Sequence, residues 1–215
     1  MKIVIVGGHG KIGLLLTRLL AGAGHEVRSL IRNPDHAADV EGVGGRPAVA
    51  DLEAITSLDL IKLIGEADVA VFAAGAGPGS DSRRKKAVDY QGAIKLISAA
   101  LQTGVQHYMM ISAKKADAEH TGDEVFDIYL RAKGKADLTL KASGLPFTVV
   151  APTTLTNDEP SGTVTLGETA EGGNISRADV AATVAALVET GKPQNQRLEL
   201  TAGSTPIEEA VAALQ

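Results

Sequence analysis

The stretch IVIVGGHGKIG, residues 3–13, decides how the rest of this chain is expected to fold. Its β-branched run at 3–6 suits a buried parallel strand. Beyond the glycines, apolar side chains recur at the spacing of one helical face, at Ile12, Leu15, Leu16, Leu19, Leu20 and Ala23. A glycine turn between such a strand and helix lets backbone N–H groups and the positive helix end face a pyrophosphate.

The glycines of this turn fit two registers of a dinucleotide-binding pattern. One begins at Gly7 and the other at Gly8, and both continue through Gly10 to Gly13. A glycine-rich turn without a ligand is the alternative interpretation. The residues predicted to hold a phosphate here are Gly7, Gly8, His9, Gly10, Lys11, Ile12 and Gly13.

Strands alternate with helices along most of the chain. Further strands are expected at 26–31, 46–50, 68–74, 105–111 and 147–151. Helices are expected at 57–64, 84–102 and 125–143. This alternation implies right-handed crossovers and an α/β fold, a doubly wound parallel sheet of the Rossmann-like kind with helices on both faces.

The character of the sequence changes after Pro152. Residues 156–173 are polar and glycine-rich, with one short strand expected at 163–166. A helix at 177–189, a strand at 197–201 and a terminal helix from 206 follow. Because 215 residues suffice for one sizeable core, we expect a single domain over 1–215, with 153–215 contributing a small substrate-side cap.

Composition excludes several classes of protein. The net charge of −5 argues against nucleic acid or an anionic membrane as partner. With no cysteine, thiol nucleophiles, disulfides and cysteine-based metal sites are excluded. Apart from His9 in the glycine turn, the histidines are His25, His36, His107 and His120. None of these four shows a carboxylate at a spacing that would pair with it, so no metal site is expected.

The expected setting is a cytoplasmic protein that acts on a small molecule as a monomer or homodimer. The chain begins directly with a strand, so no cleavable leader is expected. No apolar stretch approaches the roughly 20 residues that cross a bilayer.

The end of the second expected strand indicates which nucleotide binds. An NAD site usually places an acidic residue there, whereas this chain has Arg32 and Asn33, and Glu26 lies at the opposite end. The planar, permanently charged side chain of Arg32 suits a 2′-phosphate, and His9 and Lys11 add positive charge. NADP(H) is therefore favoured over NAD(H), with a solvated turn residue as the alternative for Arg32.

Two further strand ends contribute to the predicted nucleotide site. Asp51 is placed to receive the adenine amino group with Leu52 packed on the ring, and a helix N-cap is the alternative role for Asp51. Ala73, Ala74 and Gly75 have little bulk, so their backbone can approach a ribose closely.

A candidate reaction centre lies beyond the fifth strand. Ser112 ends that strand, and the next helix carries Tyr129 and Lys133 on one face, since they are four residues apart. A tyrosine can donate a proton to a carbonyl oxygen if nearby positive charge lowers its pKa, and a serine hydroxyl can hold the same carbonyl. A pair of surface neighbours is the alternative interpretation of the Tyr–Lys spacing.

Four motifs together resemble the short-chain dehydrogenase/reductase superfamily: GGHGKIG (7–13), Tyr129-x-x-x-Lys133, SGLPFTVVAP (143–152) and ISRADVA (175–181). The chain is similar to the atypical, NAD(P)-binding branch, near biliverdin-IX-beta/flavin reductase and NmrA-like proteins. The resemblance implies that Lys133 holds the nicotinamide ribose, that Tyr129 is the proton donor and that Ser112 orients the substrate. Ala151 departs from the pattern, because many relatives carry arginine there.

These features predict an NADPH-dependent oxidoreductase that transfers hydride to a small carbonyl, quinone or flavin-like acceptor. An NADP(H)-binding sensor without turnover is an alternative, favoured by Ala151 and the NmrA-like resemblance. A nucleotide-sugar epimerase or dehydratase is a third possibility, against which the short cap argues. The basic run at 83–86 is interpreted as a solvated face or a weak phosphate contribution.

Overall fold

A central sheet organises the chain, and the computed structural model describes residues 1–77, 79–192 and 194–214. The strands of this sheet are β1 (Lys2–Val6), β2 (Glu26–Ile31), β3 (Arg46–Val49), β4 (Val69–Phe72), β5 (His107–Ile111), β6 (Phe147–Pro152), β8 (Thr163–Gly167), β10 (Gln196–Ala202) and β11 (Thr205–Pro206). A separate two-stranded pair joins β7 (Thr154–Thr156) to β9 (Asn174–Ser176). The helices are α1 (Lys11–Gly22), η1 (Pro34–His36), α2 (Ala37–Gly42), α3 (Ser57–Ile64), α4 (Ser82–Lys85), η2 (Lys86–Gly92), α5 (Ala93–Thr103), α6 (Val125–Ala142), α7 (Arg177–Thr190) and α8 (Ile207–Ala212).

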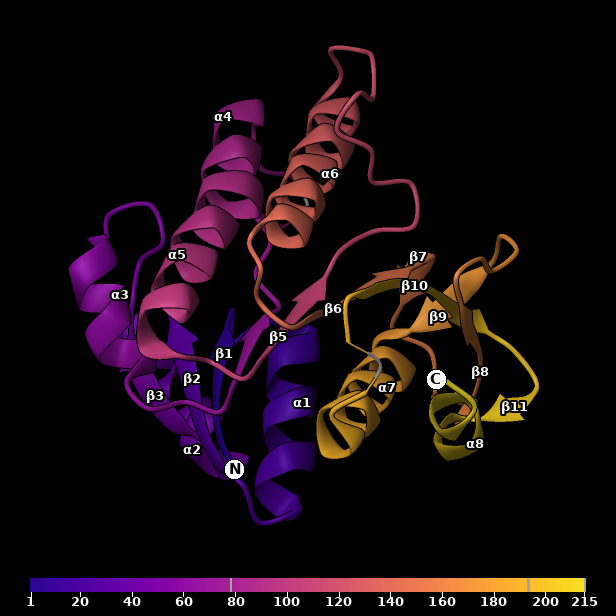
Figure 1. Ribbon diagram of the computed structural model, residues 1–215, viewed down its shortest axis with the longest axis horizontal. Coiled ribbons are helices and arrows are strands. Elements are labelled where there is room, and N and C mark those ends of the chain that lie inside the picture. The colour runs from indigo at the N-terminus through magenta and orange to yellow at the C-terminus, as the bar shows by residue number, and fades with distance from the viewer. Residues whose placement is uncertain (78, 193, 215) are drawn as a thin grey trace.

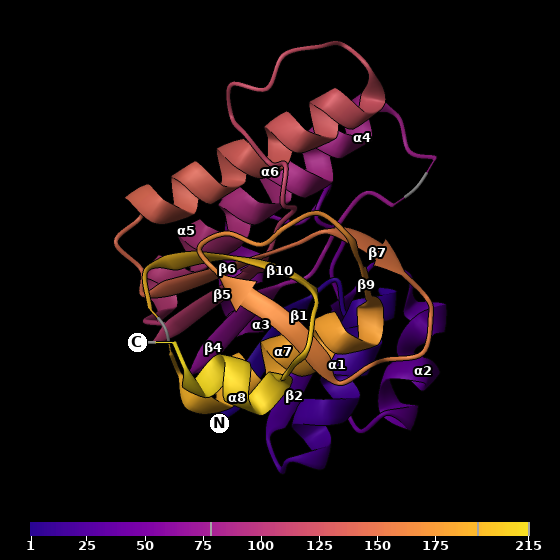
Figure 2. The ribbon, with the colours of Figure 1, turned by 90° about the vertical axis from the view of Figure 1, so that its right-hand side faces the viewer.

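The strand order confirms the predicted doubly wound sheet. It runs β11-β8-β10-β6-β5-β4-β1-β2-β3, and every pairing from β10 to β3 is parallel. Only β8 and β11, at one edge, pair in the antiparallel direction. Figure 2 shows the C-terminal elements α7, α8 and β10 on the same side of the molecule, where β8, β10 and β11 extend the sheet beyond β6.

Helices cover both faces of the sheet, as Figure 1 shows. The side chains of β1 explain why, because successive residues of a strand point to opposite faces. Val4 and Val6 pack into a core with α3, α5 and α6. Ile3 and Ile5 pack into a second core with α1 and α7. A strand buried on both faces has the continuous apolar run that the sequence shows.

Several elements differ in detail from the prediction. The helix expected at 84–102 is one continuous helical run made of α4, a π-helical segment η2, and α5. The predicted inward face of α1 is wrong at Leu19, which is 42% exposed, and at Ala23, which is exposed just after the helix ends, whereas Thr17 is buried. Thr17 can be buried because its hydroxyl donates to the Gly13 carbonyl and bonds the Ser29 hydroxyl.

The short elements α2, β7, β9 and β11 were not expected. None is longer than six residues, which is too short for a hydrophobic period to show. The strand expected at 68–74 ends early, at Phe72, because the chain leaves the sheet at Ala73 to line the site described below.

Close backbone packing holds α6 in place. A Cβ atom on Gly134 would lie 2.2 Å from the Asp117 carbonyl carbon and 2.3 Å from the Ala118 nitrogen. Both are backbone atoms, so a side chain at this position cannot be accommodated by rotation of a neighbouring side chain. Gly134 therefore fixes how the helix that carries Tyr129 and Lys133 docks on the loop after β5.

We expect Gly134→Ala to lower the free energy of unfolding by about 1–3 kcal/mol, because overpacking outweighs the gain in helix propensity. Gly22→Ala is the matched control, since Gly22 also lies in a helix but a Cβ there has nothing within 4 Å. Denaturant unfolding measures both. Equal stability of the two variants would contradict the packing account of Gly134.

Candidate functional site

The candidate site lies along the carboxyl edge of the parallel strands. The connections reverse direction between β1 and β4, which are neighbours in the sheet although β2 and β3 separate them in sequence. Ligands of doubly wound sheets bind at such switch points. Two cavities open along this edge: a first cavity of about 290 Å³ at the ends of β1, β2 and β4, and a second cavity of about 570 Å³ at the ends of β5 and β6.

The glycine loop between β1 and α1 is packed too closely for side chains. A Cβ on Gly7, whose φ is +89°, would lie 2.6 Å from the Ala74 nitrogen. A Cβ on Gly8 would lie 2.4 Å from the Ser29 Cβ, and one on Gly13 would lie 2.3 Å from the Gly7 carbonyl oxygen. The predicted tight turn is therefore present, with Gly7 against the end of β4.

The start of α1 leaves backbone donors available. Gly10 is its N-cap, no side chain caps the helix, and its first turn holds no acidic residue. The first N–H groups of an α-helix have no acceptor within the helix, and together they favour an anion. The loop thus fits a phosphate both by shape and by its donors.

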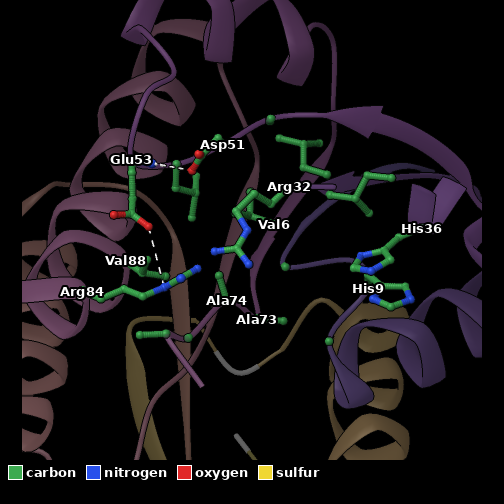
Figure 3. Close-up of a pocket in the computed structure, with 18 residues that line it drawn as sticks. Val6, His9, Arg32, His36, Asp51, Glu53, Ala73, Ala74, Arg84 and Val88 are labelled. Carbon is green, nitrogen blue, oxygen red and sulfur yellow. Dashed lines mark hydrogen bonds and ion pairs between the residues drawn. The ribbon is translucent and has the colours of Figure 1, made fainter. Parts of the chain in front are cut away.

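Two arginines face each other in the first cavity. Figure 3 shows the guanidinium groups of Arg32 and Arg84 pointing toward one another. Arg32 is exposed and makes no hydrogen bond or ion pair with the residues that the structure describes. The Arg84 Nε atom is buried without a hydrogen-bond partner there, and it lies 3.7 Å from Glu53 Oε1. An anion between the two side chains would balance their charge.

The predicted adenine and ribose contacts also line the first cavity. Asp51, Leu52, Ala73, Ala74 and Gly75 all contribute to its wall. The alternative role of Asp51 as a helix cap is wrong, because Thr56 caps α3. The Asp51 carboxylate instead accepts the Glu53 amide at 3.0 Å and closes a turn.

The side chains of His9 and Lys11 in the glycine loop have partners within the protein. His9 stacks on His36 with ring centroids 3.5 Å apart, as Figure 3 shows, and its Nε2 lies 2.7 Å from the Asp39 carboxylate. Lys11 donates to Asn157 Oδ1 at 3.1 Å. Of the other residues predicted for the nucleotide, the following do not line the first cavity: Gly8, Lys11, Ile12, Gly13, Asn33 and Lys133. The Asn33 side chain caps η1.

The second cavity brings Ser112 and Tyr129 together, but Lys133 lies behind it. Lys133 is 3% exposed, and its Nζ donates to the carbonyls of Ile111, at 3.0 Å, and Ala74, at 3.3 Å. Nζ also lies 3.6 Å from Asp89 Oδ1, which is fully buried in η2. Lys133 therefore ties the end of β4 to the end of β5.

The charge of Lys133 does not make Tyr129 more acidic than an ordinary tyrosine. Burial raises the pKa of Tyr129, Lys133 lowers it in part, and Asp89 and Asp137 raise it. The expected net lowering of this pKa is therefore wrong, because burial outweighs a lysine that is paired with Asp89. Tyr129 keeps its proton at neutral pH, and its hydroxyl has no hydrogen-bond partner in the described part of the chain.

Asp137 is a site residue that the sequence reasoning missed. Ser112 Oγ donates to its Oδ2 at 2.8 Å, and Arg197 Nε lies 3.4 Å from the same oxygen. Burial raises the pKa of Asp137 to about 6, against the lowering effects of Ser112 and Arg197. The signal was available, since Tyr129, Lys133 and Asp137 repeat at intervals of four along α6.

Arg197 and Arg84 were harder to find. Arg197 reaches the carbonyls of Ala113 and Lys114 from β10, and no sequence pattern links residues so far apart. Arg84 belongs to the basic run at 83–86, where only the position of α4 decides which member faces the cavity.

The interpretation that His25 and His120 face no carboxylate is wrong. His25 Nε2 pairs with Glu189, and His120 Nε2 lies 2.8 Å from Asp127 Oδ1. Glu189 lies 164 residues from His25, which hides this pair from sequence spacing. The described residues contain no group of three or more side chains able to hold a metal. Among them, no helix is long and apolar enough to cross a membrane.

Residues 7–191 match the protein family described as NAD(P)H-binding, and the chain belongs to this family. It is 34% identical to the uncharacterized sugar epimerase YhfK of Bacillus subtilis, over the whole of both chains. A solved structure from Bacillus halodurans, provisionally named an NAD-dependent epimerase/dehydratase, is 33% identical over both whole chains with a TM-score of 0.91. The oxidoreductase ylbE of Lactococcus lactis is 26% identical with a TM-score of 0.86, covering 100% of this chain and 96% of that one.

These comparisons agree with the resemblance to the atypical short-chain dehydrogenase/reductase branch. The fold is a mostly parallel, Rossmann-like α/β sheet, and the chain is an NAD(P)H-binding protein of oxidoreductase-like architecture.

We expect Asp137→Asn to change how stability depends on pH. The pKa of Asp137 is about 6 in the folded protein against an ordinary value of 3.8. Between pH 3.8 and about 6, this carboxyl therefore stays protonated in the folded protein but ionises in the unfolded chain. The contribution of Asp137 to wild-type stability should therefore fall by about 3 kcal/mol as pH rises through this window, a change that the asparagine variant lacks.

Denaturant unfolding at pH 4 and pH 7.5 measures this difference. Asp123→Asn is the control, because Asp123 is exposed on the loop before α6. A stability difference between wild type and Asp137→Asn that is the same at both pH values would contradict the burial account.

Proposed function

We propose that this protein is an NADPH-dependent oxidoreductase that reduces a small carbonyl, quinone or flavin-like acceptor. One observation carries the proposal: a glycine loop and two arginines at the first cavity share a sheet edge with Ser112 and Tyr129 at the second. Membership of the NAD(P)H-binding family supports a nicotinamide cofactor. When bound, that cofactor supplies the hydride.

The first cavity would hold the nucleotide. The amides of the glycine loop and the start of α1 bind the diphosphate, and Arg32 with Arg84 binds the 2′-phosphate. Asp51 and Leu52 receive the adenine, and the small residues at 73–75 let the backbone approach a ribose. Lys133 lines neither cavity and, held by two carbonyls, keeps the ends of β4 and β5 at a fixed separation. The contact with the nicotinamide ribose that the resemblance implies would require its Nζ to leave these carbonyls.

The second cavity would hold the acceptor. The protonated hydroxyl of Tyr129 is available to donate to the acceptor oxygen, and water can supply the proton in its place. Ser112 orients the acceptor, while Asp137 fixes the Ser112 hydroxyl through their 2.8 Å hydrogen bond. In this way the protein would place a proton donor beside the acceptor oxygen and hold the acceptor in a fixed orientation.

We expect Arg32→Glu to weaken NADPH binding by about 10- to 100-fold, because the change removes a charge-assisted contact to the 2′-phosphate and adds repulsion. The affinity for NADH, which has a hydroxyl there, should stay within about 3-fold or improve, because a carboxylate can bind that group. Fluorescence titration of the purified variant with each nucleotide gives both dissociation constants.

Arg83→Glu controls for the general loss of positive charge. The substitution also replaces an arginine by a glutamate, but Arg83 is exposed on α4 and does not line the first cavity. Arg84→Met should weaken NADPH preferentially as well. If Arg32→Glu weakens NADPH and NADH equally, the assignment of Arg32 to the 2′-phosphate is wrong.

We expect Tyr129→Phe to lower kcat for an aldehyde such as 4-nitrobenzaldehyde by about 100-fold, since alcohol formation needs a proton at the acceptor oxygen. The rate with menadione should change by less than about 3-fold, because a hydroquinone anion can leave unprotonated and react with water. Steady-state NADPH oxidation measures both. An unchanged aldehyde rate would remove Tyr129 from the mechanism and leave water as the donor.

A sensor that binds NADP(H) without turnover is the second candidate. The specific observation that favours it is the raised pKa of Tyr129, which burial causes and which Lys133, paired with Asp89, does not reverse. Tight NADPH binding without oxidation by any aldehyde, quinone or flavin would support the sensor. Epimerase or dehydratase activity, which the names of two relatives suggest, would instead appear as turnover of a nucleotide sugar with no net use of cofactor.

A further inference from the structure

The hydroxyl of Ser112 is shared between the second cavity and a buried carboxyl group. Ser112 lines this cavity and is 4% exposed. Its Oγ also lies 2.8 Å from Oδ2 of Asp137, a residue that does not line the cavity. A serine hydroxyl has a single hydrogen to donate and two lone pairs with which to accept. What Ser112 offers to a ligand therefore depends on how it is bonded to Asp137.

When Asp137 is ionised, Ser112 has no hydrogen left for a ligand. A carboxylate can only accept hydrogen bonds, so Ser112 gives its hydrogen to Oδ2. Arg197 supports this state, because its Nε lies 3.4 Å from the same oxygen. Only the lone pairs of Ser112 then remain for the cavity, and they cannot hold a carbonyl oxygen.

When Asp137 is protonated, the direction of this hydrogen bond reverses. Oδ1 is buried and has no hydrogen-bond partner in the described part of the chain, so a proton on Oδ1 would lack an acceptor. A proton on Oδ2 can be donated to Ser112 Oγ at 2.8 Å. Because a buried donor without an acceptor is costly, the proton belongs on Oδ2. The hydrogen of Ser112 is then free to point into the cavity.

The groups around Asp137 determine the pH at which this change takes place. Burial raises the pKa of Asp137 to about 6, and Ser112, Arg197 and Lys133 lower it in part. Arg197 is shared with a second carboxylate, since its Nη1 lies 3.5 Å from Glu199 Oε1. The carboxyl of Asp137 is therefore mostly protonated below about pH 6 and mostly ionised above it.

The hydroxyl of Tyr129 does not change in the same pH range. Burial raises the pKa of Tyr129, and the charge of Asp137 adds to this effect. Tyr129, which also lines the second cavity, therefore keeps its proton on both sides of pH 6 and can donate to a ligand in either state of Asp137. Between Ser112 and Tyr129, only Ser112 changes its donor capacity in this range.

We propose that Asp137 sets the hydrogen-bond polarity of Ser112, so that the second cavity favours a carbonyl oxygen when Asp137 is protonated and a hydrogen-bond donor when it is ionised. Asp137 is a positioning residue in this role, because it acts on the ligand through Ser112. The inference rests on the proposed function in taking the second cavity as the acceptor site. By linkage, binding of a carbonyl takes up a proton, so its affinity falls as pH rises through about 6.

Two neutral probes that share a nitrophenyl ring test this polarity. The carbonyl of 4-nitroacetophenone only accepts hydrogen bonds, whereas the amino group of N-methyl-4-nitroaniline donates one. NMR titration of the full-length protein saturated with NADP⁺ gives both dissociation constants, and no hydride is available for turnover. From pH 5 to pH 8, wild type should lose about 3- to 10-fold in affinity for the ketone, the effect of one hydrogen bond. Its affinity for the amine should stay the same or rise.

Asp137→Asn keeps the shape of the side chain but cannot ionise. Its ratio of ketone to amine affinity should therefore stay constant within about 2-fold between the two pH values. Ser112→Ala removes the hydroxyl and should lose the pH dependence as well, which keeps the test decisive if Asp137→Asn folds poorly. Asp123→Asn is the matched control, because Asp123 is exposed on the loop before α6; it should keep the wild-type change.

The main competing source of pH dependence is His120. Its Nε2 lies 2.8 Å from Oδ1 of Asp127, in the first turn of the helix that carries Tyr129. His120→Gln should keep the wild-type change in the ratio. A wild-type ratio that is the same at pH 5 and pH 8, or no binding of either probe, would overturn the proposal. A change that survives in Asp137→Asn, or that disappears in His120→Gln, would also overturn it.

These outcomes are distinct from a failure of the proposed function. If wild type oxidises no NADPH with any acceptor, the oxidoreductase proposal fails. The ratio of ketone to amine affinity still decides whether Asp137 sets the polarity of Ser112, because the titrations involve no turnover.

Discussion

The buried contact between Lys133 and Asp89 is the interaction on which the arrangement of the site depends. The two side chains are 4% and 0% exposed, and their charged atoms lie 3.6 Å apart. A buried ion is costly unless it is paired and hydrogen-bonded. Lys133 meets this condition through two strand-end carbonyls, and Asp89 accepts the Ala76 amide at 3.2 Å. Removing either partner would leave a buried charge between the two cavities.

This pair connects the geometry of the two cavities. Ala74, one acceptor of Lys133, lies against Gly7 and lines the first cavity, while Ile111, the other acceptor, directly precedes Ser112 at the second. Asp89 lies in the π-helical segment η2, an irregularity often found at functional sites. Burial is the main reason why the pKa of Tyr129 is raised, and Asp89 adds to this effect against the lowering effect of Lys133.

The parts of the fold with strong periodicity were predictable from the sequence. The ranges 26–31 and 57–64 agree fully with β2 and α3, because an apolar strand and a capped amphipathic helix each carry their own local signal. Leu19 was misassigned because Thr17 is buried by a tertiary hydrogen bond to Ser29, which no local pattern reports. The contact of Asp89 in η2 with a lysine more than 40 residues away is likewise a tertiary property.

For the candidate site, local motifs predict the glycine loop, Arg32, Ser112 and Tyr129, whereas they do not indicate partners from distant segments. Arg197 and Glu53 lie far from the residues they contact, and Arg84 faces the first cavity only because α4 starts where it does. The direction in which the pKa of Tyr129 is shifted could not be predicted from the sequence, since burial and the pairing of Lys133 are tertiary properties.

The central claim is that the first cavity recognises a nucleotide with a 2′-phosphate. Calorimetric titration of the wild-type protein with NADP⁺ and with NAD⁺ tests it most directly. The account predicts that NADP⁺ binds at least about 10-fold more tightly, with a preference that shrinks as salt screens the charges of Arg32 and Arg84. Equal affinity for the two nucleotides, or tighter binding of NAD⁺, would contradict it.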